Sequence, residues 1–357
     1  MKKGILFICF LLGGLAQSVF AQGVLTTQTV GYGARPFAWQ ESLDNELSQQ
    51  IPQQKPWQVA LFLGKELRPT EETLTTLQEQ MEKGHIARAA VLSFSKENKP
   101  ILSVLFKTQA EENITLQQIP LLETSSPEEM LSMLLKELTP QAAFYTAVLV
   151  NANSPDGLVM RYANEQILLL SQVITAIKSQ QIYVDVLDMQ VCHMGNVFSA
   201  YQLAKSHRVH YALLSSNRRR GSKQTMYYRL LTQLDLPPQQ AALAALEDLP
   251  SVENFANDRH THNLFLLDVK KLDPFFQSWR GLTGVLSLPA HTVSFAEYLL
   301  TAPSAKAKQQ AQAIEQATLA QWCYSPHTKQ LHKNSFPAES ECINGLSVNR
   351  ETARLLK

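Results

Sequence analysis

Residues 183–203 read YVDVLDMQVCHMGNVFSAYQL. The first part is an apolar run interrupted by single acids, a pattern typical of a buried strand in a parallel sheet. A Gly-Asn pair at 195–196 then ends the strand, and a helical pattern begins at Val197. We therefore expect Cys192 at the carboxyl end of a strand and just before a helix, where open α/β sheets place their ligand sites.

Strands and helices alternate on both sides of this stretch. The predicted strands cover 57–63, 87–94, 101–106, 144–150, 211–216 and 263–269, and the predicted helices cover 69–83, 127–138, 164–179, 238–246, 296–300 and 305–322. A polar loop at 96–100 predicts a hairpin between the second and third strands. This order predicts an α/β fold in which a mostly parallel sheet is flanked by helices on both faces.

The chain divides into three predicted parts. Residues 1–21 read as a secretory signal, with two lysines, an apolar middle and a small-residue cleavage site at Ala21. Residues 22–55 are a polar, Gln-rich and irregular lead-in, and residues 56–357 form one α/β domain with a helical C-terminal region. We therefore expect an exported protein, periplasmic or extracellular, that has no membrane attachment once the signal is cleaved.

The charges are balanced, with 32 basic and 31 acidic residues and a net charge of +1. Lys2 and Lys3 are the only charges before Ala21, so cleavage of the signal would leave a net charge of −1. This balance indicates no nucleic-acid partner. No cofactor is expected either, because the His-x-His pair at 260 and 262 lacks a third ligand nearby. The arginines at 218–220 are interpreted as a solvated loop, with proteolytic processing as the alternative.

Three cysteines remain after the signal, and an odd number in an oxidising compartment implies one disulfide and one unbridged thiol. Cys323 and Cys342 form the pair most easily drawn, and they would close the loop of the C-terminal region. This pairing leaves Cys192 as a candidate nucleophile, although an inert buried cysteine is the commoner fate.

The run CHMGNV at 192–197, continued by AYQL at 200–203, resembles the nucleophile segment of clostripain-like cysteine peptidases, which belong to the caspase-fold clan with gingipains and legumain. The run YALLSS at 211–216 is similar to the family's next strand, which ends in a serine. The resemblance spans roughly 57–271. It implies a caspase- or gingipain-like sheet, a peptide or protein ligand, and a binding site formed by Gln190, Asn153, Ser154 and Ser215 beside Cys192.

The sequence departs from the family at the residues that carry the chemistry. The family's catalytic histidine corresponds to Asn153 and the following glycine to Ser154, and no histidine occurs between His85 and His193. Asparagine cannot exchange a proton at useful pH, so the active site is degenerate. Gln190 replaces an acid that helps the family to recognise a basic side chain, and Phe198 replaces a frequent glutamate.

Three functions remain open. The first is a catalytically impaired homologue that binds a ligand through the former active-site cleft. The second is an active cysteine endopeptidase that uses Cys192 with a relocated histidine, His193 or His260. His193 is disfavoured because in an extended chain its side chain points away from that of Cys192. The third is a structural exported protein in which Cys192 is part of the core.

Overall fold

The computed structural model describes residues 55–64, 71–95, 99–107, 114–139, 143–152, 154, 156–161, 166–217, 229–247, 255, 259–278, 289, 291–301, 304–334, 336 and 341–356. The predicted signal and lead-in therefore lie outside the described residues, as do Asn153 and the arginines at 218–220. In the part that is described, no helix is long and apolar enough to span a membrane.

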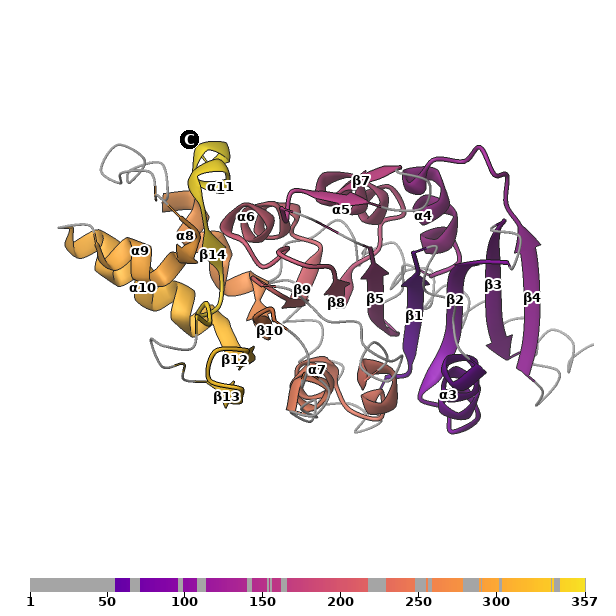
Figure 1. Ribbon diagram of the computed structural model, residues 1–357. Coiled ribbons are helices and arrows are strands. Elements are labelled where there is room, and N and C mark those ends of the chain that lie inside the picture. Colours follow the sequence, from indigo (N-terminus) through magenta and orange to yellow (C-terminus); the bar gives the residue numbers. More distant parts are fainter. Residues whose placement is uncertain are drawn as a thin grey trace, which may run out of the picture.

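A sheet of ten strands forms the centre of the molecule, in the order β13-β12-β10-β9-β8-β5-β1-β2-β3-β4 (Figure 1). Its middle is parallel and consists of β2 (Ile86–Phe94), β1 (Trp57–Phe62), β5 (Tyr145–Asn151), β8 (Val184–Gln190) and β9 (Val209–Leu214). Strand β8 is buried at every position because it lies in the middle of this parallel part.

Antiparallel strands extend the sheet on both sides of the parallel part. On one side, β3 (Pro100–Lys107) and β4 (Ile114–Pro120) follow β2. On the other side, β10 (His262–Asp268), β12 (Thr318–Ser325) and β13 (Gln330–Lys333) follow β9. The hairpin between β2 and β3 confirms the turn predicted from the polar loop.

Helices cover both faces of the sheet (Figure 1). Helices α4 (Pro127–Lys136), α5 (Leu170–Ser179) and α6 (Val197–Ser206) supply one apolar core, and α3 (Glu71–Glu82), η3 (Arg229–Gln233) and α7 (Pro238–Glu247) supply the other. The side chains of β1 alternate between the cores, with Ala60 and Phe62 in the first and Val59 and Leu61 in the second. The predicted α/β fold with helices on both faces is confirmed.

The C-terminal region gathers beside the β9 side of the sheet (Figure 1). It contains η5 (Val269–Leu272), α8 (Asp273–Ser278), α9 (Phe295–Leu300), α10 (Ala305–Ala317) and α11 (Arg350–Leu355). Two small antiparallel pairs complete the fold, namely β6 (Val159–Arg161) with β7 (Ile167–Leu169), and β11 (Val293–Ser294) with β14 (Ser347–Val348).

Two predicted helices are shorter than the sequence indicated. The segment predicted as helical over 164–179 is helical only from Leu170, because β7 pairs with β6 before it. The helix predicted over 305–322 ends at Ala317, and Thr318 begins strand β12. Pairing with β10 explains the second difference, since Trp322 is 3% exposed on β12 opposite Leu264. Strand β4 was not predicted at all.

Candidate functional site

Cys192 lies in the turn between β8 and α6, as the sequence predicted. It is partly exposed and forms no disulfide. Strand β8 pairs in parallel with β5 on one side and β9 on the other, so the carboxyl ends of all three strands meet at one edge of the sheet. This edge is the place that the fold offers for a ligand.

His193 follows Cys192 with a left-handed backbone, at φ +60°. The expectation of an extended chain at this point was therefore wrong. The backbone N–H of His193 donates to the carbonyl of Asn217 at 2.9 Å, and its ring Nδ1 lies 3.3 Å from the carbonyl oxygen of Ser216. Left-handed backbone at a residue with a side chain costs energy and is often found at functional sites.

Asn196 ends the turn and begins α6. Its Oδ1 accepts the N–H of Ser199 at 2.9 Å, which caps the helix. Its Nδ2 donates to the carbonyl of Gly157 at 2.9 Å and to that of His193 at 3.0 Å. One buried amide thus joins helix α6, the turn that carries Cys192 and the loop after β5.

A row of buried polar side chains lies below Cys192 on β8 and β5. Gln190 pairs in register with Asn151, and its Oε1 accepts the Asn151 Nδ2 at 3.2 Å. The Nε2 of Gln190 donates to Oδ2 of Asp188 at 2.9 Å. Met189 and Val191 belong to the core beneath α5 and α6, so Asp188 and Gln190 alternate toward the other face. Hydrogen bonds therefore fix both the oxygen and the nitrogen of the Gln190 amide.

The other predicted binding residues lie at the ends of the neighbouring strands. Ser154 follows β5, is 7% exposed, and accepts the N–H of Gly157 on its Oγ at 2.9 Å. Ser215 follows β9 and is fully buried, with its Oγ 2.9 Å from Oδ1 of Asn263 and 3.0 Å from the carbonyl of Asn217. Asn153, which the sequence resemblance aligns with the family's histidine, lies outside the described residues.

A contact between the C-terminal region and this edge was not predicted from the sequence. The segment Cys342–Val348, which we call the C-terminal strap, crosses beside the turn and ends in β14. The backbone N–H of Ser347 donates to the carbonyl of Gly195 at 2.8 Å, and Ser347 forms an isolated bridge with Asn196. No local pattern predicts a contact between residues so far apart in the chain.

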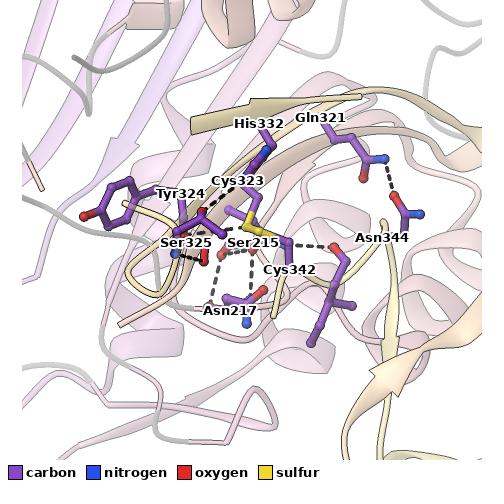
Figure 2. The surroundings of a disulfide bond; sticks show 12 residues. Ser215, Asn217, Gln321, Cys323, Tyr324, Ser325, His332, Cys342 and Asn344 are labelled. Carbon is purple, nitrogen blue, oxygen red and sulfur yellow. Dashed lines mark hydrogen bonds between the residues drawn. A yellow bond between two sulfur atoms is a disulfide. The ribbon is translucent and has the colours of Figure 1, made fainter. Parts of the chain in front are cut away.

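The predicted disulfide between Cys323 and Cys342 is present, with Cα atoms 6.1 Å apart (Figure 2). It joins β12 to the start of the C-terminal strap. Figure 2 shows the Gln321 side chain bound to that of Asn344, with Nε2 2.6 Å from Oδ1. Asn263 pairs with Cys323 between β10 and β12, and its Oδ1 accepts the Ser215 hydroxyl and the Asn217 N–H, each at 2.9 Å, so the crosslink lies beside the loop after β9.

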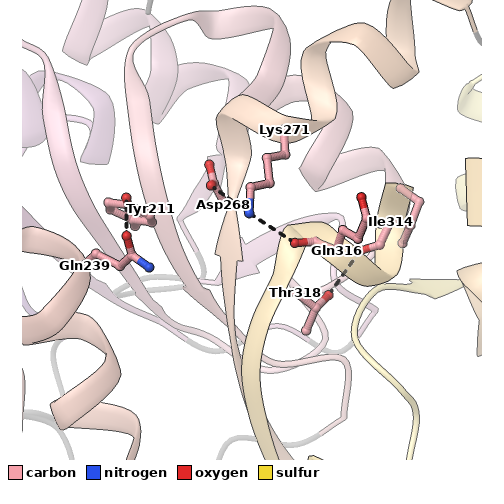
Figure 3. A network of polar contacts seen from close by, with 7 residues as sticks. All are labelled: Tyr211, Gln239, Asp268, Lys271, Ile314, Gln316 and Thr318. Atoms are coloured by element: carbon pink, nitrogen blue, oxygen red, sulfur yellow. Dashed lines mark hydrogen bonds and ion pairs between the residues drawn. The ribbon is translucent and has the colours of Figure 1, made fainter. Parts of the chain in front are cut away.

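A second polar group lies at the end of β10, where Asp268 is followed by η5 (Figure 3). Burial raises the pKa of Asp268, and the nearby Lys271 opposes this shift with its Nζ 3.6 Å from Oδ2. Because β10 is antiparallel to β9, Asp268 pairs with Tyr211 and lies far along the strand from Ser215. Among the described side chains, no group of three His, Cys, Asp or Glu residues could hold a metal ion.

The chain was compared with protein-family models, curated proteins and solved structures. No family model and no curated protein matches the sequence. A solved inactive zymogen of a C11 protease from Parabacteroides distasonis is 12% identical over 86% of this chain and 95% of its own, with a TM-score of 0.56. A secreted C11 cysteine protease from Bacteroides thetaiotaomicron, solved in complex with an irreversible peptide inhibitor, is 12% identical over 83% of this chain and 93% of its own, with a TM-score of 0.58.

A second structure of a secreted C11 cysteine protease from Bacteroides thetaiotaomicron, called iotapain, is 11% identical over 83% of this chain and 94% of its own, with a TM-score of 0.55. The chain therefore has the fold of the caspase-like C11 cysteine proteases, the clostripain-like group that the sequence resembles. At this level of identity the likeness establishes the fold, and function has to be argued from the site.

Proposed function

We propose that this protein is an exported clostripain-like peptidase homologue that binds a peptide segment beside Cys192 and is impaired in peptide cleavage. The observation that carries the proposal is the sequence at the end of β5. The chain has Asn153 where the resemblance calls for the catalytic histidine, and no histidine precedes His193 back to His85. Because β5 and β8 pair in register, the loop after β5 starts beside the turn of Cys192.

Chemical requirements explain why this replacement impairs cleavage. A cysteine peptidase must ionise its thiol and protonate the leaving amine, and a histidine commonly performs both tasks. General acid–base catalysis contributes about 10²–10⁴-fold to a rate, and an amide side chain cannot supply it.

The uncharged side chain of Gln190 supports a peptide ligand that need not carry an arginine or a lysine at this position. Its uncharged amide is held between Asn151 and Asp188, so it presents no carboxylate to an incoming arginine or lysine. The peptide class is supported by the Bacteroides thetaiotaomicron protease of the same fold, which was solved with a peptide inhibitor. Export is supported by the signal-like residues 1–21.

The decisive experiment is Asn153→His, assayed against a peptide library. We expect the natural chain to cleave no peptide and Asn153→His to gain cleavage that disappears when Cys192→Ala is added. Asn153→Gln is the matched control, because it changes the size of the side chain without supplying an imidazole. Cys192-dependent cleavage by the natural chain would overturn the impairment.

A second candidate is an active hydrolase in which His193 serves as the base. The observation that favours it is the left-handed turn, which removes the objection based on an extended chain. This candidate predicts that iodoacetamide labels Cys192 at pH 6 faster than it labels free cysteine, and that His193→Ala abolishes the difference. A labelling rate no higher than that of free cysteine would exclude it, and His260→Ala tests the other histidine in the same assay.

A further inference from the structure

The carbonyl oxygen of Gly195, three residues after Cys192, is held by two different parts of the chain. It accepts the Ser347 N–H at 2.8 Å and the Ser216 hydroxyl at 2.6 Å, and the Ser347 Oγ lies 3.2 Å away. The Ser216 Oγ also lies 2.5 Å from the carbonyl of Gly345. Ser216 is 3% exposed, and its single hydroxyl proton is shared between these two carbonyl oxygens.

The strap that makes these contacts is fixed to β12 at two points. Cys342 is bridged to Cys323, and the Gln321 side chain binds two neighbouring residues of the strap. Its Oε1 accepts the Gly345 N–H at 2.9 Å, and its Nε2 donates to Asn344 Oδ1 at 2.6 Å (Figure 2). The crosslink is therefore three residues from a peptide group that contacts Ser216.

The turn itself has no room to move toward the sheet. The N–H of Gly195 donates to the Ser215 carbonyl at 2.7 Å. A Cβ on Gly195 would lie 2.6 Å from Cε1 of Phe265 and 2.7 Å from the backbone N of Ser216. The turn is therefore packed against the loop after β9 on one side and held by the strap on the other.

We propose that Ser216 is a positioning residue that clamps the Cys192 turn to the C-terminal strap, and that the Cys323–Cys342 disulfide keeps the clamp closed. Opening the disulfide with a dithiol reductant loosens the turn. In that step the S–S bond takes two electrons and two protons and becomes two thiols, and the reductant is oxidised to a disulfide. The inference deepens the proposed function, because the turn that it controls carries the proposed binding site.

The clamp is tested in the full exported chain by native-state hydrogen exchange of the Gly195 and Ser347 amides and by the rate of Cys192 alkylation with iodoacetamide. We expect Ser216→Ala and the Cys323→Ser/Cys342→Ser pair each to accelerate exchange at both amides about threefold to tenfold, the effect of losing one net hydrogen bond. Alkylation of Cys192 should accelerate in the same variants. Ser206→Ala is the matched control, because it removes another buried hydroxyl at the far end of α6.

The combined variant distinguishes positioning from a general loss of stability. If Ser216 and the disulfide act through one clamp, the acceleration of Gly195 amide exchange in the combined variant should be smaller than the product of the accelerations in the two separate variants. Independent effects, or equal exchange in Ser216→Ala and Ser206→Ala, would overturn the proposal. If the cysteine pair variant does not fold, the Ser216→Ala result decides alone. Neither readout requires a peptide, so failure of the clamp and failure of the proposed function give different results.

Discussion

Gly157 lies against the carbonyl group of His193, so closely that a Cβ atom on Gly157 would stand 2.0 Å from the His193 oxygen. Gly157 also has φ +76°, which residues with side chains rarely adopt. The loop after β5 and the turn after β8 thus meet through bare backbone. Only glycine permits this approach, and the Asn196 amide completes it by binding the Gly157 carbonyl.

Gly157→Ala should destabilise the protein and displace the Cys192 turn. The left-handed backbone alone costs about 1–2 kcal/mol for a residue with a Cβ, and the overlap with His193 should add about 1–3 kcal/mol. Gly84→Ala is the matched control, because Gly84 has φ +80° with no atom within 4 Å of its added Cβ. Urea denaturation of both variants measures the difference, and equal losses would show that the contact with His193 is not constraining.

Asn196 caps α6 through its Oδ1 and holds the Gly157 and His193 carbonyl groups through its Nδ2, and two substitutions can separate these roles. Asn196→Ala removes the cap of α6 and both contacts of Nδ2, and should cost about 1–2 kcal/mol from the cap alone. Asn196→Asp keeps the Oδ1 acceptor for Ser199 but cannot donate to Gly157 or His193. We expect faster iodoacetamide labelling of Cys192 in both variants, whereas Asn349→Ala, which removes the cap of α11, should leave the labelling rate unchanged.

Gln190→Asp should destabilise the protein at neutral pH by about 1–3 kcal/mol, because a donor to Asp188 is replaced by a second buried carboxylate. The loss should shrink as the pH falls and one of the two carboxylates becomes protonated. Gln190→Met removes the same hydrogen bonds without adding a second carboxylate, so its loss should vary less with pH than that of Gln190→Asp. Thermal unfolding of both variants between pH 4 and pH 8 measures this, and an equal pH dependence would contradict the explanation.

The contribution of Asp268 to folding stability should change with pH in the opposite direction from that of an ordinary salt-bridged carboxylate. Burial raises its pKa in the folded protein, whereas in the unfolded chain it should be about 3.9. The folded state therefore binds more protons, and stability falls as the pH rises from about 4 to the higher folded pKa. Asp268→Asn should remove this fall and gain stability relative to the natural chain over that interval. Lys271→Met should enlarge the fall and extend it to higher pH, since it removes the charge that opposes the raised pKa of Asp268.

Removal of the disulfide should lower global stability as well as loosen the turn. The Cys323–Cys342 bridge closes a loop with a sequence separation of 19 residues, and such a crosslink contributes about 3 kcal/mol in the chain-entropy view. The Cys323→Ser/Cys342→Ser variant should therefore unfold roughly 5–10 °C lower in a thermal scan. Cys192→Ala removes a thiol without opening a crosslink, and an equal loss in that variant would point to Cys192 as a core residue.

Patterns within a few residues predicted most of the sheet and the place of Cys192. The apolar run ending at Val191 and the Gly-Asn pair after it locate the strand, the turn and α6, because both signals are local. The capping box that begins α4 is another local feature, with bonds of 2.8 and 3.2 Å between Ser126 and Glu129. Such features need no information about the rest of the chain.

Features that depend on distant partners were missed. The helical pattern of 305–317 runs directly into Thr318, and only pairing with β10 turns the following residues into a strand. Strand β4 is polar and largely exposed at the edge of the sheet, so it lacks the apolar alternation of a strand. The left-handed turn at His193 is likewise set by the Asn217 and Gly157 backbones and not by its own residue type.

The contact between Ser347 and Gly195 has a consequence for how the protein matures. The two residues are 152 positions apart in the chain, so the peptide that completes the environment of Cys192 is synthesised long after the turn that carries Cys192. Long-range contacts of this kind form late in folding. We therefore expect a newly made chain to acquire the parallel strands around β8 first, and to complete the surroundings of Cys192 only after residues 342–348 have been made and the Cys323–Cys342 bridge has formed.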